Sequence, residues 1–220
     1  SIFIGGFETP QVRAQIGDTY PVIYGESFLR NEEGKIVVDD NPASPNYGFP
    51  LTGGPAVIGK VSPDFILGGG TTFTYRRWSL NALVEWKQGG EMYSGSNGLL
   101  DYYGLSKRTE DRESTFIYNG VKSDGSPNDI ARGGPNDPLA LQSLHTNVLT
   151  NIDEYYIFEN SFVKLRELAL KYKPEKLFKK LDMGVSVFAR NLLLWTALPN
   201  LDPESSQGNT NMGGSFERFT

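Results

Sequence analysis

Period-two alternation within residues 78–87 constrains the fold of this chain more than any other feature of its sequence. Large or apolar side chains take the even positions, which are Trp78, Leu80, Ala82, Val84 and Trp86. The odd positions are polar or charged except for Leu83. Because successive side chains of a β-strand point to opposite faces, this pattern predicts a strand with one apolar and one polar face.

The residues before this strand alternate in the same way. Within 65–75, one face collects Phe65, Leu67, Phe73 and Tyr75, and glycine or threonine fills most of the other positions. The pair Arg76-Arg77 then separates two alternating runs and is short enough for a tight reversal. We therefore expect a β-hairpin over residues 65–87.

A second strand-rich zone covers residues 162–195, around the connection 174–181. Its later half alternates from Met183 onward, whereas its earlier half changes parity. The apolar residues of that earlier half are Val163 and Leu165, then Leu168, Leu170 and Tyr172. A β-bulge near Arg166-Glu167 would reconcile the two runs, since one extra residue reverses the facing of everything after it. A helix is the alternative, and Pro174 and the β-branched and aromatic content argue against it.

Connection lengths suggest what kind of β protein this is. Short reversals near 76–77 and 174–181 alternate with long stretches at 1–64, 88–161 and 196–220, which hold most of the 25 glycines and 13 prolines. Outer-membrane barrels have short periplasmic turns, long extracellular loops, and strands that alternate lipid-facing apolar with lumen-facing polar residues. We predict an all-β fold, namely a portion of a transmembrane antiparallel β-barrel with long extracellular loops. A soluble β-sandwich is the alternative.

Aromatic and charged residues of these strands fit the barrel interpretation. Trp78 and Trp86 lie about 26 Å apart along one strand face at roughly 3.3 Å per residue, which suits two interfacial girdles of a tilted strand. The candidates for the lipid interface are Trp78, Trp86, Tyr75 and Trp195. The candidates for the lumen side, where they would line the channel or contact a plug, are Arg76, Glu85, Lys87 and Arg190.

The composition argues against several other functions. A chain without cysteine has no disulfide, thiolate zinc site or cysteine nucleophile. His145 is the only histidine and no G-x-S-x-G motif accompanies it, so we expect no enzyme activity. The acidic stretches 39–41 and 124–129 lack calcium-loop spacing and are interpreted as turns, so no metal or other cofactor is predicted. The net charge of −5 without a basic stripe argues against nucleic acid.

Tyrosines in the stretch 88–161 are the candidates for contact with a substrate or partner. They are Tyr93, Tyr102, Tyr103, Tyr118, Tyr155 and Tyr156. Aromatic faces stack on sugar rings or hold peptide side chains. The alternative is that these side chains fill a small core of the loop itself.

Several short stretches carry a family likeness when taken together. They are Ile23-Tyr24-Gly25 with residues 28–39, residues 58–65 with Trp86-Lys-Gln-Gly-Gly90, residues 160–170 (NSFVKLRELAL), Ala189-Arg190-Asn191-Leu192, and Asn200-Leu-Asp-Pro-Glu204. In this order they resemble the SusC/RagA class of TonB-linked outer-membrane transporters, specifically the C-terminal part of the barrel. The resemblance covers most of the chain.

The resemblance implies a TonB-dependent importer of the cell outer membrane with a barrel of about 22 strands. Such a receptor takes up glycans or peptides together with a SusD-like surface lipoprotein, and TonB acts through an N-terminal plug. We expect this chain to be a fragment that lacks the plug and the closing strand after Thr220. The alternative function is that of a secreted or surface β-rich carbohydrate-binding or adhesin module.

The expected organisation follows from these points. Residues 1–64 form an extracellular loop region with small β elements, and residues 65–87 form a barrel hairpin. Residues 88–161 form a long extracellular loop, and 162–195 form a second barrel hairpin. Residues 196–220 form an extracellular loop that leads to a missing last strand.

Overall fold

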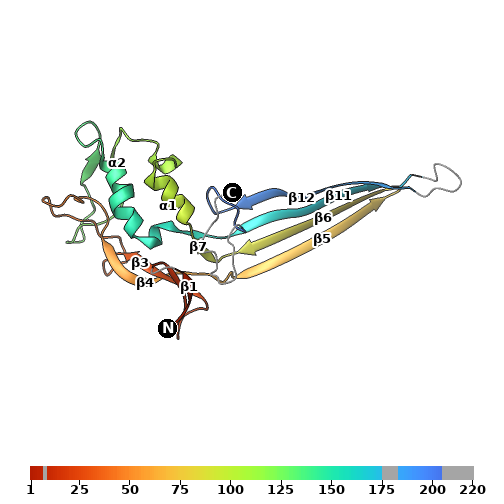
Figure 1. Cartoon of the computed structure of the whole chain (residues 1–220), viewed down its shortest axis with the longest axis horizontal. Helices are drawn as coiled ribbons and strands as arrows, with labels where there is room; N and C mark the ends of the chain where they lie inside the picture. Colours follow the sequence, from red (N-terminus) through yellow and green to blue (C-terminus); the bar gives the residue numbers. More distant parts are fainter. Residues whose placement is uncertain (7–8, 175–182, 205–220) are drawn as a thin grey trace. The chain divides into compact units, whose positions relative to one another are not determined.

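A computed structural model describes residues 1–6, 9–174 and 183–204 of the chain (Figure 1). These residues divide into two compact units. Unit 1 contains residues 1–62 and 91–158 together with Glu204, and unit 2 contains residues 63–90 and 159–203. Within the described residues, no helix has the length and apolar character needed to cross a membrane.

Unit 2 is built on one four-stranded antiparallel sheet in the order β12-β11-β6-β5. Its strands are β5 (Phe65–Tyr75), β6 (Trp78–Gln88), β11 (Phe162–Tyr172) and β12 (Val185–Thr196). Strands β5 and β6 pair from Phe65 opposite Gln88 to Tyr75 opposite Trp78, which is the hairpin that the alternation predicts. Arg76 in the connection has a φ of 54°, the left-handed conformation that tight hairpin turns use.

The predicted β-bulge in β11 is confirmed. The register of β11 shifts between Leu165 and Glu167 against both neighbouring strands. On one side of the shift Leu165 lies opposite Val84, and on the other side Leu168 lies opposite Ala82. Directly opposed residues share a face. Val163, Leu165, Leu168, Leu170 and Tyr172 therefore all join the apolar face of β6 despite their change of parity. The helix alternative for residues 162–173 is wrong.

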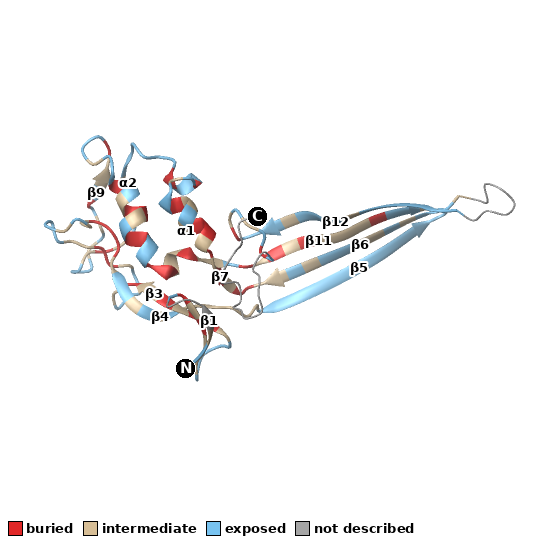
Figure 2. Cartoon of the chain, in the orientation of Figure 1, coloured by how far each residue is buried: buried red, intermediate tan, exposed pale blue. Residues whose placement is uncertain are grey.

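The apolar face of this sheet is open in the described residues. Strand β5 is exposed along its whole length, as Figure 2 shows, and Phe73 is 65% and Val187 71% exposed. A contiguous exposed apolar surface is rare on soluble monomers and is normal on lipid-facing strands. The all-β class is confirmed, and the four strands fit a portion of a barrel wall, although the described residues form no closed barrel.

Unit 1 contains a second antiparallel sheet and a set of short helices. The sheet, in the order β1-β2-β3-β4, consists of β1 (Ile2–Gly6), β2 (Gln11–Ala14), β3 (Val22–Phe28) and β4 (Thr52–Lys60). The helices are α1 (Gly95–Tyr102), η1 (Lys107–Thr109), α2 (Ala140–Ser143), η2 (Leu144–Val148), η3 (Leu149–Asn151) and η4 (Asp153–Tyr156). Two short strand pairs complete the described elements: β7 (Glu91–Tyr93) with β10 (Ile157–Glu159), and β8 (Thr115–Ile117) with β9 (Ala131–Gly133).

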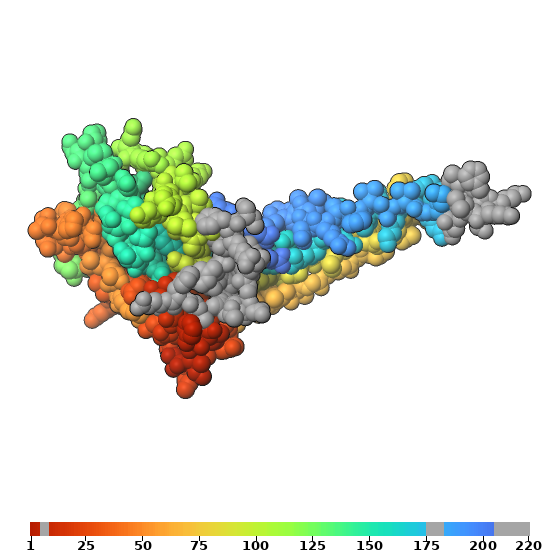
Figure 3. All heavy atoms as spheres, viewed as in Figure 1, coloured from red at the N-terminus to blue at the C-terminus, as the bar shows by residue number. Residues whose placement is uncertain are grey.

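One hydrophobic core joins the early and late segments of unit 1. It consists of Phe28, Phe49, Ala140, Leu144, Val148, Leu149 and Ile152. Segments 95–112 and 138–150 also lie against one another in the space-filling view (Figure 3). Residues 91–158 are therefore a packed structure and not an open loop.

Carboxylates fix this packed segment to the backbone of the unit 1 sheet. Asp153 Oδ2 accepts a hydrogen bond from the Glu26 N–H at 2.9 Å, and Glu154 Oε2 accepts one from the Phe28 N–H at 2.8 Å. The close contact between Asp153 and β3 requires glycine at position 25, because a Cβ there would lie 2.6 Å from Asp153 Oδ2. Two backbone donors of β3 thus find acceptors on η4.

Candidate ligand-binding pocket

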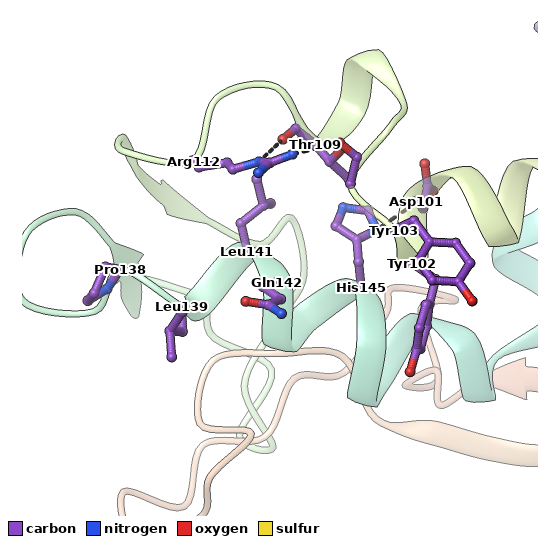
Figure 4. Close-up of a pocket in the computed structure, with 11 residues that line it drawn as sticks. Asp101, Tyr102, Tyr103, Thr109, Arg112, Pro138, Leu139, Leu141, Gln142 and His145 are labelled. Carbon is purple, nitrogen blue, oxygen red and sulfur yellow. Dashed lines mark hydrogen bonds and ion pairs between the residues drawn. The ribbon is translucent and has the colours of Figure 1, made fainter.

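A pocket of about 310 Å³ lies in unit 1 beside the C-terminal end of α1 (Figure 4). Its wall combines the end of α1, the loop after it, and the helical segment around α2 and η2. The lining residues that matter for its chemistry are Asp101, Tyr102, Tyr103, Arg112, Gln142 and His145. Both polar and aromatic groups are therefore available to a ligand.

Helix α1 begins at a capped residue and ends with one buried and two exposed side chains. The Ser94 hydroxyl accepts a hydrogen bond from the Asn97 N–H at 3.2 Å at the start of the helix, as an N-cap residue does. At the other end Asp101 is 1% exposed, whereas Tyr102 and Tyr103 are 47% and 68% exposed. The helix thus turns a carboxylate inward and two aromatic rings outward within three consecutive residues.

The two exposed tyrosines form a corner at the pocket. Their ring centroids lie 5.2 Å apart with an interplanar angle of 80°. Edge-to-face contact of this kind holds both rings while leaving their outer faces open. The corner offers flat apolar surfaces in two directions.

Asp101, Arg108 and His145 lie close together beside the pocket. Arg108 Nη2 lies 2.8 Å from Asp101 Oδ2, and His145 Nδ1 lies 3.7 Å from the same oxygen. The side chains of Asp101 and His145 are almost fully buried. In the part of the chain that the structure describes, neither the Asp101 oxygens nor His145 Nδ1 has a hydrogen-bond partner. The Asp101 charge is thus balanced by a nearby guanidinium but not hydrogen-bonded.

The imidazole of His145 is held in its neutral form. Burial lowers the pKa of His145 below its ordinary value of 6.5 and Arg108 lowers it further, while Asp101 acts in the opposite direction. A neutral imidazole has one N–H donor and one nitrogen that accepts. His145 therefore presents an acceptor as well as a donor.

Arg112 binds backbone carbonyls of the loop that forms one wall of the pocket. Its Nε donates to the Thr109 carbonyl at 3.1 Å and its Nη2 to the Gly104 carbonyl at 2.6 Å. Gly104 has a φ of 68°, and a Cβ there would lie 2.7 Å from Arg112 Nη2. The guanidinium thus donates hydrogen bonds to two backbone carbonyls of the loop that follows α1.

The structure separates the six tyrosines that the sequence analysis grouped. Tyr102 and Tyr103 reach the pocket, whereas Tyr118 and Tyr155 pack against the hydrophobic core of unit 1. Tyr156 is 2% exposed and meets Tyr93 edge to face at 6.5 Å. Burial raises the pKa of Tyr156, so its hydroxyl keeps its proton.

Sequence reasoning missed Asp101, Arg112 and Gln142 as pocket residues, and considered His145 only for catalysis. Asp101 and His145 stand far apart in the sequence and belong to no spaced motif. The one available signal was the Asp-Tyr-Tyr run at 101–103, which places a carboxylate beside two aromatics.

The polar face of the unit 2 sheet carries ion pairs. Arg166, the residue at the bulge, binds Glu85 through two hydrogen bonds of 2.9 and 3.0 Å. Arg190 pairs with Glu167 at 3.5 Å, and the buried Lys164 pairs with Asp202 at 3.1 Å. Opposed charges thus lie across neighbouring strands on this face.

Three of the four lumen candidates belong to this polar face. Glu85 and Arg190 make the ion pairs described above, and Lys87 lies opposite Phe162 on the same face. Arg76 does not join them, because the hairpin reversal uses this residue, and its guanidinium lies 5.3 Å from the centre of the Tyr75 ring. Whether the polar face lines a channel stays a prediction.

The lipid-interface candidates all lie on the apolar face, in two groups. Tyr75 and Trp78 are paired at the turn end of β5 and β6, where Trp78 also contacts Tyr172 at 4.5 Å. Trp86 lies near the opposite end of β6 and contacts Phe65 at 4.9 Å, and Val163 separates it from Trp195 across the sheet. Contact of these groups with lipid remains a prediction.

The two acidic stretches fold as turns. Asp39 Oδ1 accepts a hydrogen bond from the Asn41 N–H at 3.0 Å, and Asp124 Oδ1 accepts one from the Ser126 N–H at 2.9 Å. Among the residues 1–6, 9–174 and 183–204, no group of three histidine or acidic side chains is arranged to hold a metal ion.

Taken together, the strands define the class of protein. A continuous antiparallel sheet with an open apolar face, aromatic ends and a charged opposite face has the pattern of an outer-membrane β-barrel wall. No family model matches the chain. It is 26% identical over 160 residues to TonB-dependent receptor P3 of Formosa agariphila, an alignment that covers 70% of this chain and 14% of that protein.

Solved structures of a related type were also found. The RagAB peptide importer in the closed-closed state matches with 17% identity over 90% of this chain and 22% of that chain, at a TM-score of 0.45. The RagAB peptide transporter matches with 18% identity over 89% and 20%, at a TM-score of 0.49. The predicted resemblance to TonB-dependent receptors of the SusC/RagA type is confirmed as a likeness in sequence to one such receptor. The chain spans about 14% of the length of its curated relative.

Proposed function

We propose that this chain supplies barrel strands and extracellular loops to a TonB-dependent importer that takes up glycans or peptides with a SusD-like lipoprotein. The observation that carries the proposal is the two-faced sheet of unit 2. Its apolar face is open and ends in aromatic residues, and its opposite face holds the pairs Glu85–Arg166 and Glu167–Arg190. A wall between lipid and an aqueous lumen requires this division.

In this proposal the chain binds and passes cargo and makes or breaks no covalent bond. The hairpins within 65–87 and 162–195 cross the outer membrane. The regions 1–64, 88–161 and 196–220 lie outside the cell, where the tyrosine corner of the pocket would meet cargo or the lipoprotein. The last of these regions includes residues 205–220, which lie outside the described residues. Cargo would move inward when TonB acts on the plug, in a part of the receptor beyond this chain.

Fractionation of the producing cells tests this proposal. We expect the intact receptor in the outer-membrane fraction, extracted only by detergent, and with an electrophoretic mobility that changes on boiling as folded barrels unfold. A matched deletion of its gene should abolish growth on the cargo polymer. Recovery of the protein in the culture medium without detergent would instead favour the secreted adhesin alternative and contradict the proposal.

A further inference from the structure

The contact between α1 and η2 has a polar centre that lacks hydrogen bonds. At the end of α1, Asp101 Oδ2 lies 3.7 Å from His145 Nδ1 of η2, and both side chains are almost fully buried. Neither the Asp101 oxygens nor His145 Nδ1 has a hydrogen-bond partner in residues 1–6, 9–174 and 183–204. Unpaired buried polar groups cost free energy. This contact therefore contributes less stability than a fully hydrogen-bonded one would, so a change of charge at its centre weighs heavily.

The two ends of α1 are held in different ways. Just before the helix, the Ser94 N–H donates to the Tyr156 carbonyl at 2.8 Å, and the Ser94 hydroxyl caps the first turn. The C-terminal end lies against η2, where Asp101 and His145 meet. This end also carries the tyrosine corner, Tyr102 and Tyr103. A change of charge on His145 therefore acts on the end of the helix that presents these two rings.

Positive charge near His145 disfavours a further proton on its ring. Asp101 is the carboxylate of this contact, and the guanidinium of Arg108 already lies 2.8 Å from it. Arg112 lines the same pocket as His145 and donates to two neutral backbone carbonyls, which leave its charge uncompensated (Figure 4). A protonated His145 would thus be a third cation around one carboxylate. A buried charge without a counter-charge of its own is strongly unfavourable.

The other elements packed against η2 do not offset this charge in the part of the chain that the structure describes. The helices α2 and η3, which flank η2 in sequence, contain no ionisable residue. From η4, the Tyr155 ring lies 6.3 Å from the His145 ring, and burial raises the pKa of the Tyr155 hydroxyl, which keeps it neutral. Burial lowers the pKa of His145, Asp101 opposes this change, and Arg108 adds to it. The packed contact therefore fits the neutral imidazole.

We propose that the contact between α1 and η2 is an acid-sensitive joint, in which protonation of His145 releases the C-terminal end of α1 and moves the tyrosine corner. Once released, the imidazole regains its ordinary pKa of 6.5. The closed joint therefore has its full stability above that pH and loses stability as the pH falls toward the lowered pKa of the packed ring. Acid thus changes the surface that unit 1 presents beside its pocket.

Hydrogen exchange of the intact receptor in detergent, at about pH 5 and about pH 8, tests this proposal. The amides of Tyr103, Gly104 and Leu105 report on the joint, because they donate to carbonyls of α1. A helix this short is unstable without its packing, so release exposes these amides. We expect their protection, relative to unfolded receptor at the same pH, to fall several-fold at the lower pH. One histidine with a pKa of 6.5 limits the change to about thirtyfold.

Two substitutions test the role of charge separately. His145→Gln cannot be protonated in this range, so its α1 amides should be equally protected at both pH values. Arg108→Gln removes the cation that occupies Asp101, which leaves the carboxylate to a protonated His145 at 3.7 Å. Its acid loss should therefore disappear or reverse. Comparing each variant with itself at two pH values separates the titration from any change in packing.

Lys107→Gln is the matched control, because Lys107 is an exposed cation next to Arg108 that does not line the pocket. It should keep the acid loss of the unchanged receptor. The amides of β3 report on opening of unit 1 as a whole and should not lose protection in acid.

Four results would overturn the proposal. They are equal protection at both pH values in the unchanged receptor, an acid loss that persists in His145→Gln, an undiminished loss in Arg108→Gln, and an equal loss in β3, which would indicate general acid unfolding. If Arg108→Gln does not fold, the comparison between the unchanged receptor and His145→Gln decides the matter. Neither the proposal nor its test depends on which cargo the receptor imports.

Discussion

Asp153 shows how a single side chain ties unit 1 together. Its carboxylate accepts the Glu26 N–H across 127 positions of sequence, and Gly25 leaves the space for it. Burial raises the pKa of Asp153 above its ordinary value of 3.8, the hydrogen bond from the Glu26 N–H opposes this, and the nearby Glu26 carboxylate adds to the increase. Folding therefore disfavours the charged carboxylate of Asp153 relative to its protonated form, although the carboxylate accepts a hydrogen bond from the Glu26 N–H.

The direction of this pKa change predicts a pH dependence. A raised pKa means that the folded state binds the Asp153 proton more tightly than the unfolded state does. Protonation of Asp153 therefore contributes its full stabilisation below pH 3.8, and this contribution is lost as the pH rises through the raised pKa. Asp153→Asn keeps an oxygen for the Glu26 N–H and removes the buried charge. We expect its urea midpoint at neutral pH to equal or exceed that of the unchanged receptor, with a flatter profile under mildly acidic conditions.

Hydrogen exchange of the β3 amides tests whether the change in stability arises in unit 1, because the Glu26 N–H of β3 donates to Asp153. The control is Asp18→Asn at an exposed position, for which the profile should not change. A midpoint of Asp153→Asn below that of the unchanged receptor at every pH would show that the charge itself is required.

At the scale of elements, the bulge in β11 illustrates what sequence reasoning recovers. The change of parity between Leu165 and Leu168 is visible in the sequence, and only a bulge keeps both residues on one face of a strand. The ion pair between Arg166 and Glu85 was not foreseen, because residues on different strands become neighbours only once the register is known. Local periodicity predicts a strand, but pairing across the sheet depends on the fold.

Deletion of Arg166 should leave the sheet able to assemble. Without the extra residue, Leu165 and Glu167 become consecutive, and both halves of β11 keep the facing that they have opposite β6. We therefore expect heat-modifiable, folded receptor in the outer membrane at close to the normal level. A large loss confined to this deletion would contradict the expectation and would mean that assembly needs the bulge itself.

Arg166→Ala is the control for that deletion. It retains the bulge and removes the guanidinium that pairs with Glu85, so folded receptor should accumulate at close to the normal level. Equal loss in both variants would mean that the ion pair, and not the register, is what assembly requires.

At the scale of the whole molecule, the two units are stabilised differently. Most buried apolar residues of the described chain belong to unit 1, and unit 2 contributes Phe162, Ala169 and Leu198. A four-stranded sheet with so few buried side chains has no core of its own. Lipid takes the place of that core if the open face lies in a membrane.

Arginine substitutions on the two faces of β6 test this difference. Ala82 lies midway between Trp78 and Trp86 on the apolar face, and the neighbouring Asn81 lies on the polar face. We expect Ala82→Arg to destabilise the folded receptor by about 2–4 kcal/mol and Asn81→Arg to have little effect. Denaturation of both variants in lipid vesicles measures the difference, and equal effects would contradict a lipid-facing surface.

The sequence predicted the sheet of unit 2 better than unit 1. Alternation over eleven-residue strands is a strong signal, whereas the helices of residues 95–156 are short and follow no sustained period. The pocket could not be predicted because Asp101 and His145 meet only when α1 and η2 pack together. Tyr118, Tyr155 and Tyr156 were candidates for contact with cargo because aromatic residues serve cores and binding sites equally well.

The end of β6 and the start of β11 are held together by hydrogen bonds of their flanking residues. The Asn160 N–H donates to the Gly90 carbonyl at 2.8 Å, and the Gly89 N–H donates to the Ser161 hydroxyl at 2.7 Å. Lengthening a loop whose ends are already closed costs little. A change in the length of an exposed turn within residues 91–158 can therefore leave the register of β6 and β11 as it is.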